Sequence, residues 1–252
     1  MAAIDEDARR VYFRSPGSRD RAAAALRQEF PGLTATPVDV ADEDWAGRSQ
    51  AALTAVRIGT IIVTPPWDPV WGGDSGRSVA ATPEPLVRVV IQPSMGFGTG
   101  HHATTRLCLA HLQELDVRGR TAVDVGTGSG VLAIAASRLG AVQVLAIDDD
   151  PDAIASARAN LALNPGVDVT LGTLDLRRAG WRPFDLVLAN LTGGLLTAAA
   201  GALARLTARG GRLILSGFME SEERDVLAAF ALHRVERRSQ EDEWVCVTLA
   251  AA

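Results

Sequence analysis

From residue 86 onward, short apolar runs alternate with longer stretches whose apolar positions recur every three or four residues. The short runs predict strands and the longer stretches predict helices. The expected strands cover 86–91, 121–125, 142–147, 167–170, 184–189 and 212–216. The expected helices cover 102–115, 130–139, 151–163, 194–208 and 220–232. Strands and helices that alternate in this way predict an α/β fold, with a parallel sheet covered by helices on both faces.

The last part of the chain departs from this alternation. Strands are expected at 233–238 and 244–249, and the residues between them carry no helical pattern. Two consecutive strands of this kind favour an antiparallel hairpin, which we expect at one edge of the sheet.

The first 85 residues show a weaker pattern. A strand at 11–13, a helix at 21–30 and a strand at 33–40 predict a small α+β unit. Residues 42–85 are rich in proline and glycine, which predicts a linker around one strand at 56–63. The expected domains are a small α+β substrate-recognition domain at 1–50, a linker at 51–85 and the α/β domain at 86–252.

Composition limits the partners of this protein. The chain has 252 residues, of which 47% are hydrophobic and 22% charged, as in a globular protein with a sizeable core. Its net charge of −5 shows no basic excess, so we expect no direct contact with nucleic acid. No apolar run approaches the ~20 residues that span a bilayer, and the polar N-terminus does not resemble a secretion signal. We therefore expect a cytoplasmic monomer that has no membrane contact.

Cysteine and lysine usage excludes some chemistry. Cys108 and Cys246 lie far apart in the sequence, and two cysteines alone make no metal cluster. The chain contains no lysine, which excludes Schiff-base mechanisms and other catalytic lysines.

The strand at 121–125 runs directly into the turn Gly126-Thr127-Gly128-Ser129-Gly130 and then into a helix. Glycines let a ligand approach the backbone closely, and a helix start presents unpaired N–H groups. A dinucleotide site requires a further glycine where Val131 stands, and a P-loop requires a lysine. The observed spacing is typical of S-adenosylmethionine sites, with Gly126, Gly128 and Gly130 as expected contacts. A tight turn without a ligand is the alternative.

The next strand, at 142–147, ends in Asp148. In folds of this kind an acidic residue about 20 residues after the glycine loop accepts hydrogen bonds from ribose hydroxyls. Asp148 is therefore the expected ribose ligand. Asp150 and Pro151 have a structural explanation as the N-cap and first residue of a helix. Asp175 is a further candidate beside the adenine.

The strand at 184–189 ends in Asn190-Leu191, at the sheet edge where the methyl donor is expected. Methyltransferases that act on the amino groups of nucleobases usually have an aromatic residue shortly after this position. Leu-Thr-Gly stands here instead, which argues against a flat base and leaves a non-planar amine. We expect the side-chain carbonyl of Asn190 to orient an amine proton.

The segment 95–105 carries three glycines around Phe97, followed by His101, His102, Thr104 and Thr105. Glycines around a single aromatic ring predict a flexible lid over a pocket. Adjacent histidines seldom chelate one ion, and no acidic or cysteine partner has suitable spacing, so we expect no metal. The two threonines either cap the next helix or bind the cofactor.

Three of these segments resemble one known family. The stretch 96–105, the loop 124–130 and Ala189-Asn190-Leu191 are similar to the PrmA-type methyltransferases of large-subunit ribosomal protein eleven. Asp42-Glu43-Asp44-Trp45 and Glu243-Trp244-Val245 also match that family. The resemblance is close from Leu86 to the end of the chain and thin before Trp45.

The resemblance implies a Rossmann-like, seven-stranded class I methyltransferase domain that uses S-adenosylmethionine, preceded by a small substrate-recognition domain. It also implies methylation of lysine side-chain amines, and of an N-terminal amine, on the ribosomal protein. Carried over by position, the cofactor contacts are Thr105, Gly126, Asp148 and Asn190. Many members have a longer first domain, and proline is common where this chain has Ala103.

An amine acceptor has consequences for the chemistry. A lysine amine has a pKa near 10.4, so its neutral form costs roughly 4–5 kcal/mol at pH 7, and a neighbouring sulfonium cation reduces that cost. In-line attack then depends on alignment, which contributes ~7–11 kcal/mol. We expect Asn190 to orient the amine and Phe97 to close the pocket against water. The alternatives are methylation of another protein lysine or a small amine, and a non-catalytic S-adenosylmethionine-binding module.

Overall fold

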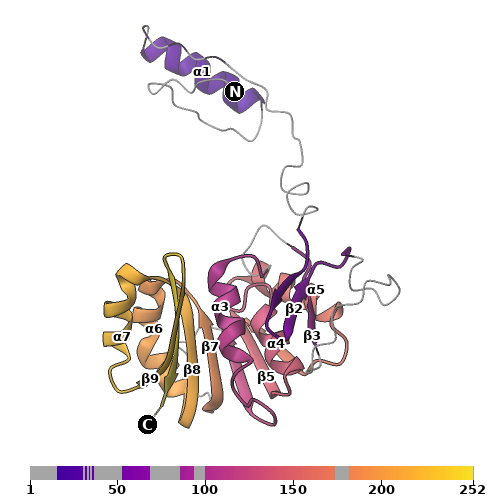
Figure 1. Ribbon diagram of the computed structural model, residues 1–252. Helices are drawn as coiled ribbons and strands as arrows, with labels where there is room; N and C mark the ends of the chain where they lie inside the picture. Colours follow the sequence, from indigo (N-terminus) through magenta and orange to yellow (C-terminus); the bar gives the residue numbers. More distant parts are fainter. Residues whose placement is uncertain are drawn as a thin grey trace. The chain divides into compact units, whose positions relative to one another are not determined.

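The computed structural model describes residues 16–30, 32, 34, 36, 53–68, 86–93, 100–173 and 182–251. The chain divides into two compact units, Met1–Ser49 and Gln50–Ala252. In the first unit, α1 covers Pro16–Glu29 (Figure 1) and so begins earlier than the expected helix at 21–30. Proline fits the first turn of a helix, where its missing N–H group has no partner to lose. The expected strand at 11–13 and most of that at 33–40 lie outside the described residues.

The second unit is built on a seven-stranded sheet, as the α/β pattern predicts. In chain order its strands are β4 (Thr121–Val125), β5 (Val142–Asp148), β6 (Val169–Thr173), β7 (Phe184–Asn190), β8 (Thr207–Met219), β9 (Arg234–Glu241) and β10 (Trp244–Ala250). Their order across the sheet is β6-β5-β4-β7-β8-β10-β9. The five strands from β6 to β8 are parallel, whereas β10 runs antiparallel to both of its neighbours.

The hairpin expected at the end of the chain is present, and its second strand lies inside the sheet. Strand β10 is inserted between β8 and β9, so β9 forms the edge. Val245 and Val247 of β10 are buried on one face and Cys246 on the other. The sequence of β9, RVERRSQE, has almost no apolar residues, which suits an exposed edge strand.

Helices cover both faces of this sheet (Figure 1). They are α3 (Ala103–Leu112), α4 (Val131–Arg138), α5 (Pro151–Ala162), α6 (Gly193–Leu206), the short η2 (Glu220–Glu222) and α7 (Glu223–Ala229). Helices α3 and α4 pack in one hydrophobic core, and α6 and α7 pack in the other. Strand β7 divides its side chains between the two cores: Leu186 and Leu188 face one, Val187 and Ala189 the other. Among the described helices, none has the length and apolar character needed to cross a membrane.

A second, three-stranded sheet differs from the expected linker. It consists of β1 (Val56–Ile58), β2 (Ile61–Thr64) and β3 (Val87–Val90), with β2 in the middle. The strand expected at 86–91 therefore exists, but it pairs parallel with β2 and takes no part in the main sheet. Apolar side chains of β2 and β3 join the core around α3 and α4. The stretch 51–85 thus contributes two core strands to the second unit.

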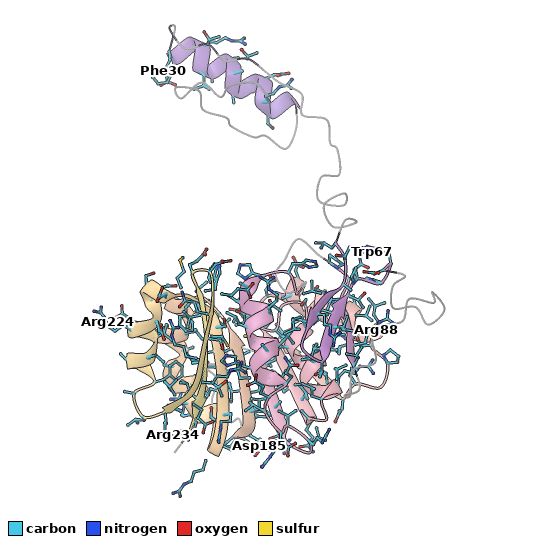
Figure 2. All side chains as sticks on the ribbon, viewed as in Figure 1. Phe30, Trp67, Arg88, Asp185, Arg224 and Arg234 are labelled. Carbon is cyan, nitrogen blue, oxygen red and sulfur yellow. The ribbon has the colours of Figure 1, made fainter. Side chains whose placement is uncertain are left out.

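The strand order creates a switch point between β4 and β7. From β4 the chain moves outward through β5 and β6, then returns to place β7 on the other side of β4. Ligands of open α/β sheets bind at such a point, beyond the carboxyl ends of the strands. Asp185 lies at the opposite, amino ends of the strands (Figure 2). Its carboxylate accepts hydrogen bonds there from Thr121 N (2.9 Å) and Thr121 Oγ1 (3.0 Å).

Candidate active site

The glycine loop that follows β4 has the backbone conformation that only glycine adopts easily. The φ angles of Gly126, Gly128 and Gly130 are 69°, 53° and 82°, all in the left-handed region. A Cβ atom on Gly126 would lie 2.4 Å from Leu191 Cδ2, so a larger residue there requires the Leu191 side chain to move. Conformation therefore favours glycine at all three positions, and close packing adds a second reason at Gly126.

Asp124 lies inside β4, just before the loop, and its carboxylate binds the loop. Its role was not among those expected from the sequence. Its Oδ2 accepts hydrogen bonds from Thr127 Oγ1 (2.6 Å) and from Ala133 N (3.2 Å), which ties the loop to the start of α4. Burial raises the pKa of Asp124 to about 6, and the two hydrogen bonds oppose that shift. The sequence signal for this role is an acidic residue inside the short, mostly buried strand TAVDV.

Asp148 lies at the end of β5 and faces the same loop. Its Oδ2 accepts a hydrogen bond from Gly128 N (3.0 Å), and its Oδ1 accepts one from Asp150 N (3.1 Å). Each carboxylate oxygen has a second lone pair, so both retain capacity to accept from a ribose hydroxyl. Asp150 caps α5 by accepting from Asp152 N (2.9 Å), with Pro151 in the first turn, which confirms their structural interpretation.

Asn190 ends β7 beside the glycine loop, because Val125 of β4 pairs with Ala189. The turn that follows is held by β8, where Leu191 N donates to Ser216 O (2.9 Å). Gly217 has a φ of 92°, and a Cβ atom there would lie 2.4 Å from Leu191 O. The backbone after β7 is thus tightly packed on both sides, which fixes the position of the half-buried Asn190.

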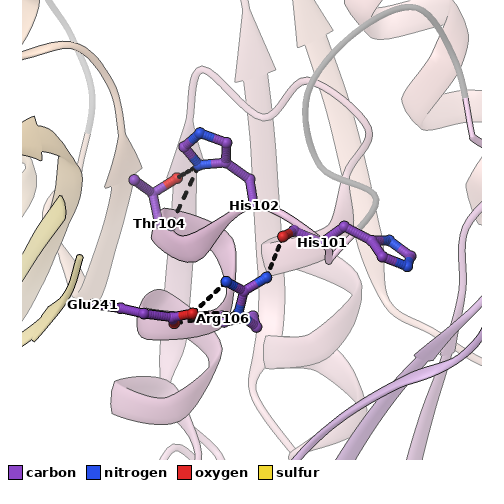
Figure 3. Close-up of polar contacts among 5 residues, drawn as sticks. All are labelled: His101, His102, Thr104, Arg106 and Glu241. Carbon is purple, nitrogen blue, oxygen red and sulfur yellow. Dashed lines mark hydrogen bonds and ion pairs between the residues drawn. The ribbon is translucent and has the colours of Figure 1, made fainter. Parts of the chain in front are cut away.

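The start of α3 corrects one expectation about the threonines. The helix is capped by His102, whose Nδ1 lies 2.8 Å from Thr104 Oγ1 and 3.4 Å from Thr104 N (Figure 3). Thr104 and Thr105 therefore lie within the first turn and do not cap it. Thr105 is buried in the first turn of α3. Its role as a cofactor contact stays a prediction. The His102 ring also packs edge-on against Trp244 of β10, with ring centroids 4.9 Å apart.

Arg106 ties the same end of α3 to the sheet edge. Its guanidinium donates to Glu241 of β9 and to the backbone carbonyl of His101 (Figure 3). Among the described residues, no group of three or more His, Cys, Asp or Glu side chains could hold a metal ion. Phe97 and Asp175 lie outside the described residues, so their expected roles stay predictions.

Comparisons with known proteins agree with this arrangement. A family model described as ribosomal protein L11 methyltransferase (PrmA) matches residues 11–252. The ribosomal protein L11 methyltransferase of Geobacter sulfurreducens is 44% identical over 235 residues, which cover 90% of this chain and 72% of that protein. That of Deinococcus radiodurans is 36% identical over 244 residues, covering 88% and 86%. The crystal structure of ribosomal protein L11 methylase from Lactobacillus delbrueckii subsp. bulgaricus is 26% identical, with a TM-score of 0.68, covering 79% of this chain and 99% of that one. Because the family model matches residues 11–252 and these relatives are more than 30% identical over most of the chain, the chain belongs to the ribosomal protein L11 methyltransferase (PrmA) family.

Proposed function

We propose that this protein transfers methyl groups from S-adenosylmethionine to lysine amines, and to an N-terminal amine, of ribosomal protein L11. One observation carries the proposal: the glycine loop, Asp148 and Asn190 meet at the carboxyl ends of the adjacent strands β4, β5 and β7. Within this proposal the enzyme works in the cytoplasm as a monomer, and its substrate is a protein and not a nucleic acid. Residues 1–50 serve to recognise that substrate.

The residues present fit S-adenosylmethionine. The loop carries no side chains at Gly126, Gly128 and Gly130, as is typical of a loop that binds a ligand through its backbone. The N-cap of α4 is Gly130, which contributes no side-chain cap, although Asp124 accepts a hydrogen bond from Ala133 N in the first turn. Asp148 would hold the ribose hydroxyls, and Thr105 and Asn190 are the further expected contacts. When bound, the cofactor supplies an electrophilic methyl group next to a sulfonium cation.

The reaction requires a neutral, aligned amine. Asn190 carries no charge, so its carbonyl accepts an amine N–H without stabilising the ammonium form as a carboxylate would. The packing of Leu191 between Gly126 and Gly217 restrains the backbone from which the Asn190 side chain extends. Alignment of this kind contributes ~7–11 kcal/mol of barrier reduction, and the proton of the ammonium form passes to solvent before the attack. Phe97 is assigned the closure of the pocket against water.

The surroundings of Asn190 suit a cationic, lysine-bearing segment. Glu220 and Glu222 directly follow β8. Glu220 N donates a hydrogen bond to the backbone carbonyl of Glu243 (2.8 Å), so Glu243 lies next to Glu220. Glu222 also lies against the start of α6, because a Cβ on Gly193 would meet its Oε1 at 2.7 Å. We name these residues, Glu220, Glu222 and Glu243, the acidic rim. Exposed Met219 adjoins them and offers apolar contact. Glu220 is already ion-paired with Arg238 (3.7 Å), so Glu222 and Glu243 supply the charge complementarity that supports a basic protein substrate.

The test is methyl transfer from labelled S-adenosylmethionine to purified ribosomal protein L11 by the full chain. We expect protease-sensitive label on L11 and none on a small amine such as free lysine at the same amine concentration. The Asn190→Ala variant should lower kcat by more than it weakens cofactor binding, while the nearby exposed Thr192→Ala should leave both unchanged. Label on the small amine but not on L11 would overturn the substrate. Cofactor binding without transfer to any acceptor would favour a binding module.

A further inference from the structure

Two buried asparagine side chains lie at the end of α5, outside the residues that the reaction uses directly. Asn160 stands in the last turns of the helix and Asn164 just beyond it, and neither exposes any surface to solvent. A buried amide is costly unless its N–H and C=O groups are hydrogen-bonded. The partners of these two amides therefore show which parts of the fold they hold together.

Asn160 joins the glycine loop to the small sheet. Its Nδ2 donates to Ser129 O (2.8 Å), inside the loop, and its Oδ1 accepts from Gln92 N (2.8 Å). Gln92 follows β3 and shortly precedes Phe97 in the chain. One amide thus connects the proposed cofactor loop with the strand that leads into the segment carrying Phe97, across 31 residues of sequence on one side and 68 on the other.

Asn164 holds the same strand without touching the loop. Its Oδ1 accepts from Val90 N (2.9 Å), and its Nδ2 donates to Val90 O (2.7 Å) and to Asn160 O (2.8 Å). Asn164 therefore has the chemistry and burial of Asn160 and bonds a nearby residue of the same segment, Val90, but its hydrogen bonds do not include Ser129. This makes it a matched comparison for a role that depends on the loop.

We infer that Asn160 is a positioning residue that couples cofactor binding at the glycine loop to the placement of Gln92. The inference rests on the proposed function. A cofactor that contacts the loop backbone restricts the Ser129 carbonyl, and Asn160 passes that restriction to Gln92 N through a single rigid amide plane. Coupling of this kind is reciprocal, so fixing Gln92 also strengthens cofactor binding.

The experiment combines four variants with two readouts. Cofactor affinity is measured by calorimetry with S-adenosylhomocysteine, and hydrogen exchange of the Gln92 amide is measured with and without it. We expect the ligand to slow Gln92 exchange in the unmodified protein and in Asn164→Ala. In Asn160→Ala that effect should disappear and the affinity should fall about five- to tenfold, the size of one lost hydrogen bond.

Asn160→Asp separates the two bonds, and Asn164→Asp is its control because it places the same charge at an equally buried site. An ionised aspartate keeps an acceptor for Gln92 N but has no donor for Ser129 O, and a thermal melt of each variant shows that it is folded under the conditions of the measurement. We expect near-normal Gln92 exchange without ligand, no further slowing with ligand, and a similar loss of affinity. A rise in the KM for the cofactor with little change in kcat should accompany it.

Two results would overturn the coupling. Equal loss of affinity in Asn164→Ala and Asn160→Ala would show a structural role shared by both amides. A Gln92 amide that exchanges equally fast with and without ligand in the unmodified protein would show that nothing is transmitted. If the unmodified protein binds no S-adenosylhomocysteine at all, the proposed function fails as well, so the two failures are distinguishable.

Discussion

At pH 7 the Asp124→Asn substitution is expected to raise the free energy of unfolding of the ligand-free protein. Burial raises the pKa of Asp124 from 3.8 to about 6, although Thr127 and Ala133 donate hydrogen bonds to it. The folded protein therefore carries this charge at a cost above pH 6. An asparagine oxygen can accept the same two hydrogen bonds without the charge. A shift of about two pKa units corresponds to roughly 3 kcal/mol, the upper limit of the expected gain.

The sign of the pH dependence follows from the direction of the shift. A raised pKa stabilises the folded state below pH 3.8, and this contribution is lost as the pH rises to about 6. His111 acts in the opposite sense. Its ring is buried beside Thr248, and burial, with a smaller contribution from Arg237, lowers its pKa from 6.5 to about 4. The stability contributed by neutral His111 is present above pH 6.5 and is lost as the pH falls toward 4.

The two contributions oppose each other between about pH 4 and pH 6 in the unmodified protein. The His111 contribution is the same in both proteins and cancels in their difference. The stability of Asp124→Asn relative to the unmodified protein should therefore fall by about 1.4 kcal/mol per pH unit as the pH drops through this range, because only the unmodified protein gains stability by protonating Asp124. Denaturant unfolding followed by tryptophan fluorescence, in steps from pH 4 to pH 7.5 without cofactor, measures the difference.

Asp185→Asn is the control for this prediction. The pKa of Asp185 is lowered, chiefly because Thr121 N donates to its carboxylate, so the charged form is favoured in the folded protein. This substitution should lower stability at pH 7, opposite to Asp124→Asn. A stability difference between Asp124→Asn and the unmodified protein that does not change with pH would refute the reasoning.

Three further substitutions test the candidate site. Gly126→Ala should weaken cofactor binding and lower the melting temperature more than Gly166→Ala, since both have positive φ but only the first Cβ would meet a neighbouring side chain; equal losses would contradict this. Asp148→Ala should weaken cofactor binding more than tenfold by calorimetry, whereas the adjacent exposed Asp149→Ala should not, and unchanged affinity would remove Asp148 from the site. Asn190→Ala should reduce single-turnover methyl transfer more than cofactor affinity, and equal losses would make it a cofactor ligand only.

Much of the main sheet could be predicted because its signals are local. The strand at 121–125 has the predicted bounds, since an apolar run that ends at a glycine turn defines both ends of a strand. The Asp150–Pro151 start of α5 was predictable for the same reason, because an N-cap and its helix lie within a few residues. The glycine loop, Asp148 and Asn190 were recognisable because each directly follows such a strand.

Other features depend on residues that are distant in the sequence. An apolar run such as 86–91 pairs equally well with any free strand edge, and only the packing of β2 and β3 against α3 and α4 places it in the small sheet. The position of β10 inside the sheet follows from burial on both of its faces, a property of the assembled layers.

The sequence by itself determined the α/β class, the order of most elements and the three strand ends that carry the proposed chemistry, because periodicity and turn residues act over a few positions. The tertiary structure decided how these parts hold one another. The roles of Asp124 and Asn160 depend on their hydrogen-bond partners. Only the folded chain brings Asp124 to Thr127, and Asn160 to Ser129 and Gln92. Such polar groups are satisfied by three-dimensional neighbours, and no local pattern records those neighbours in advance.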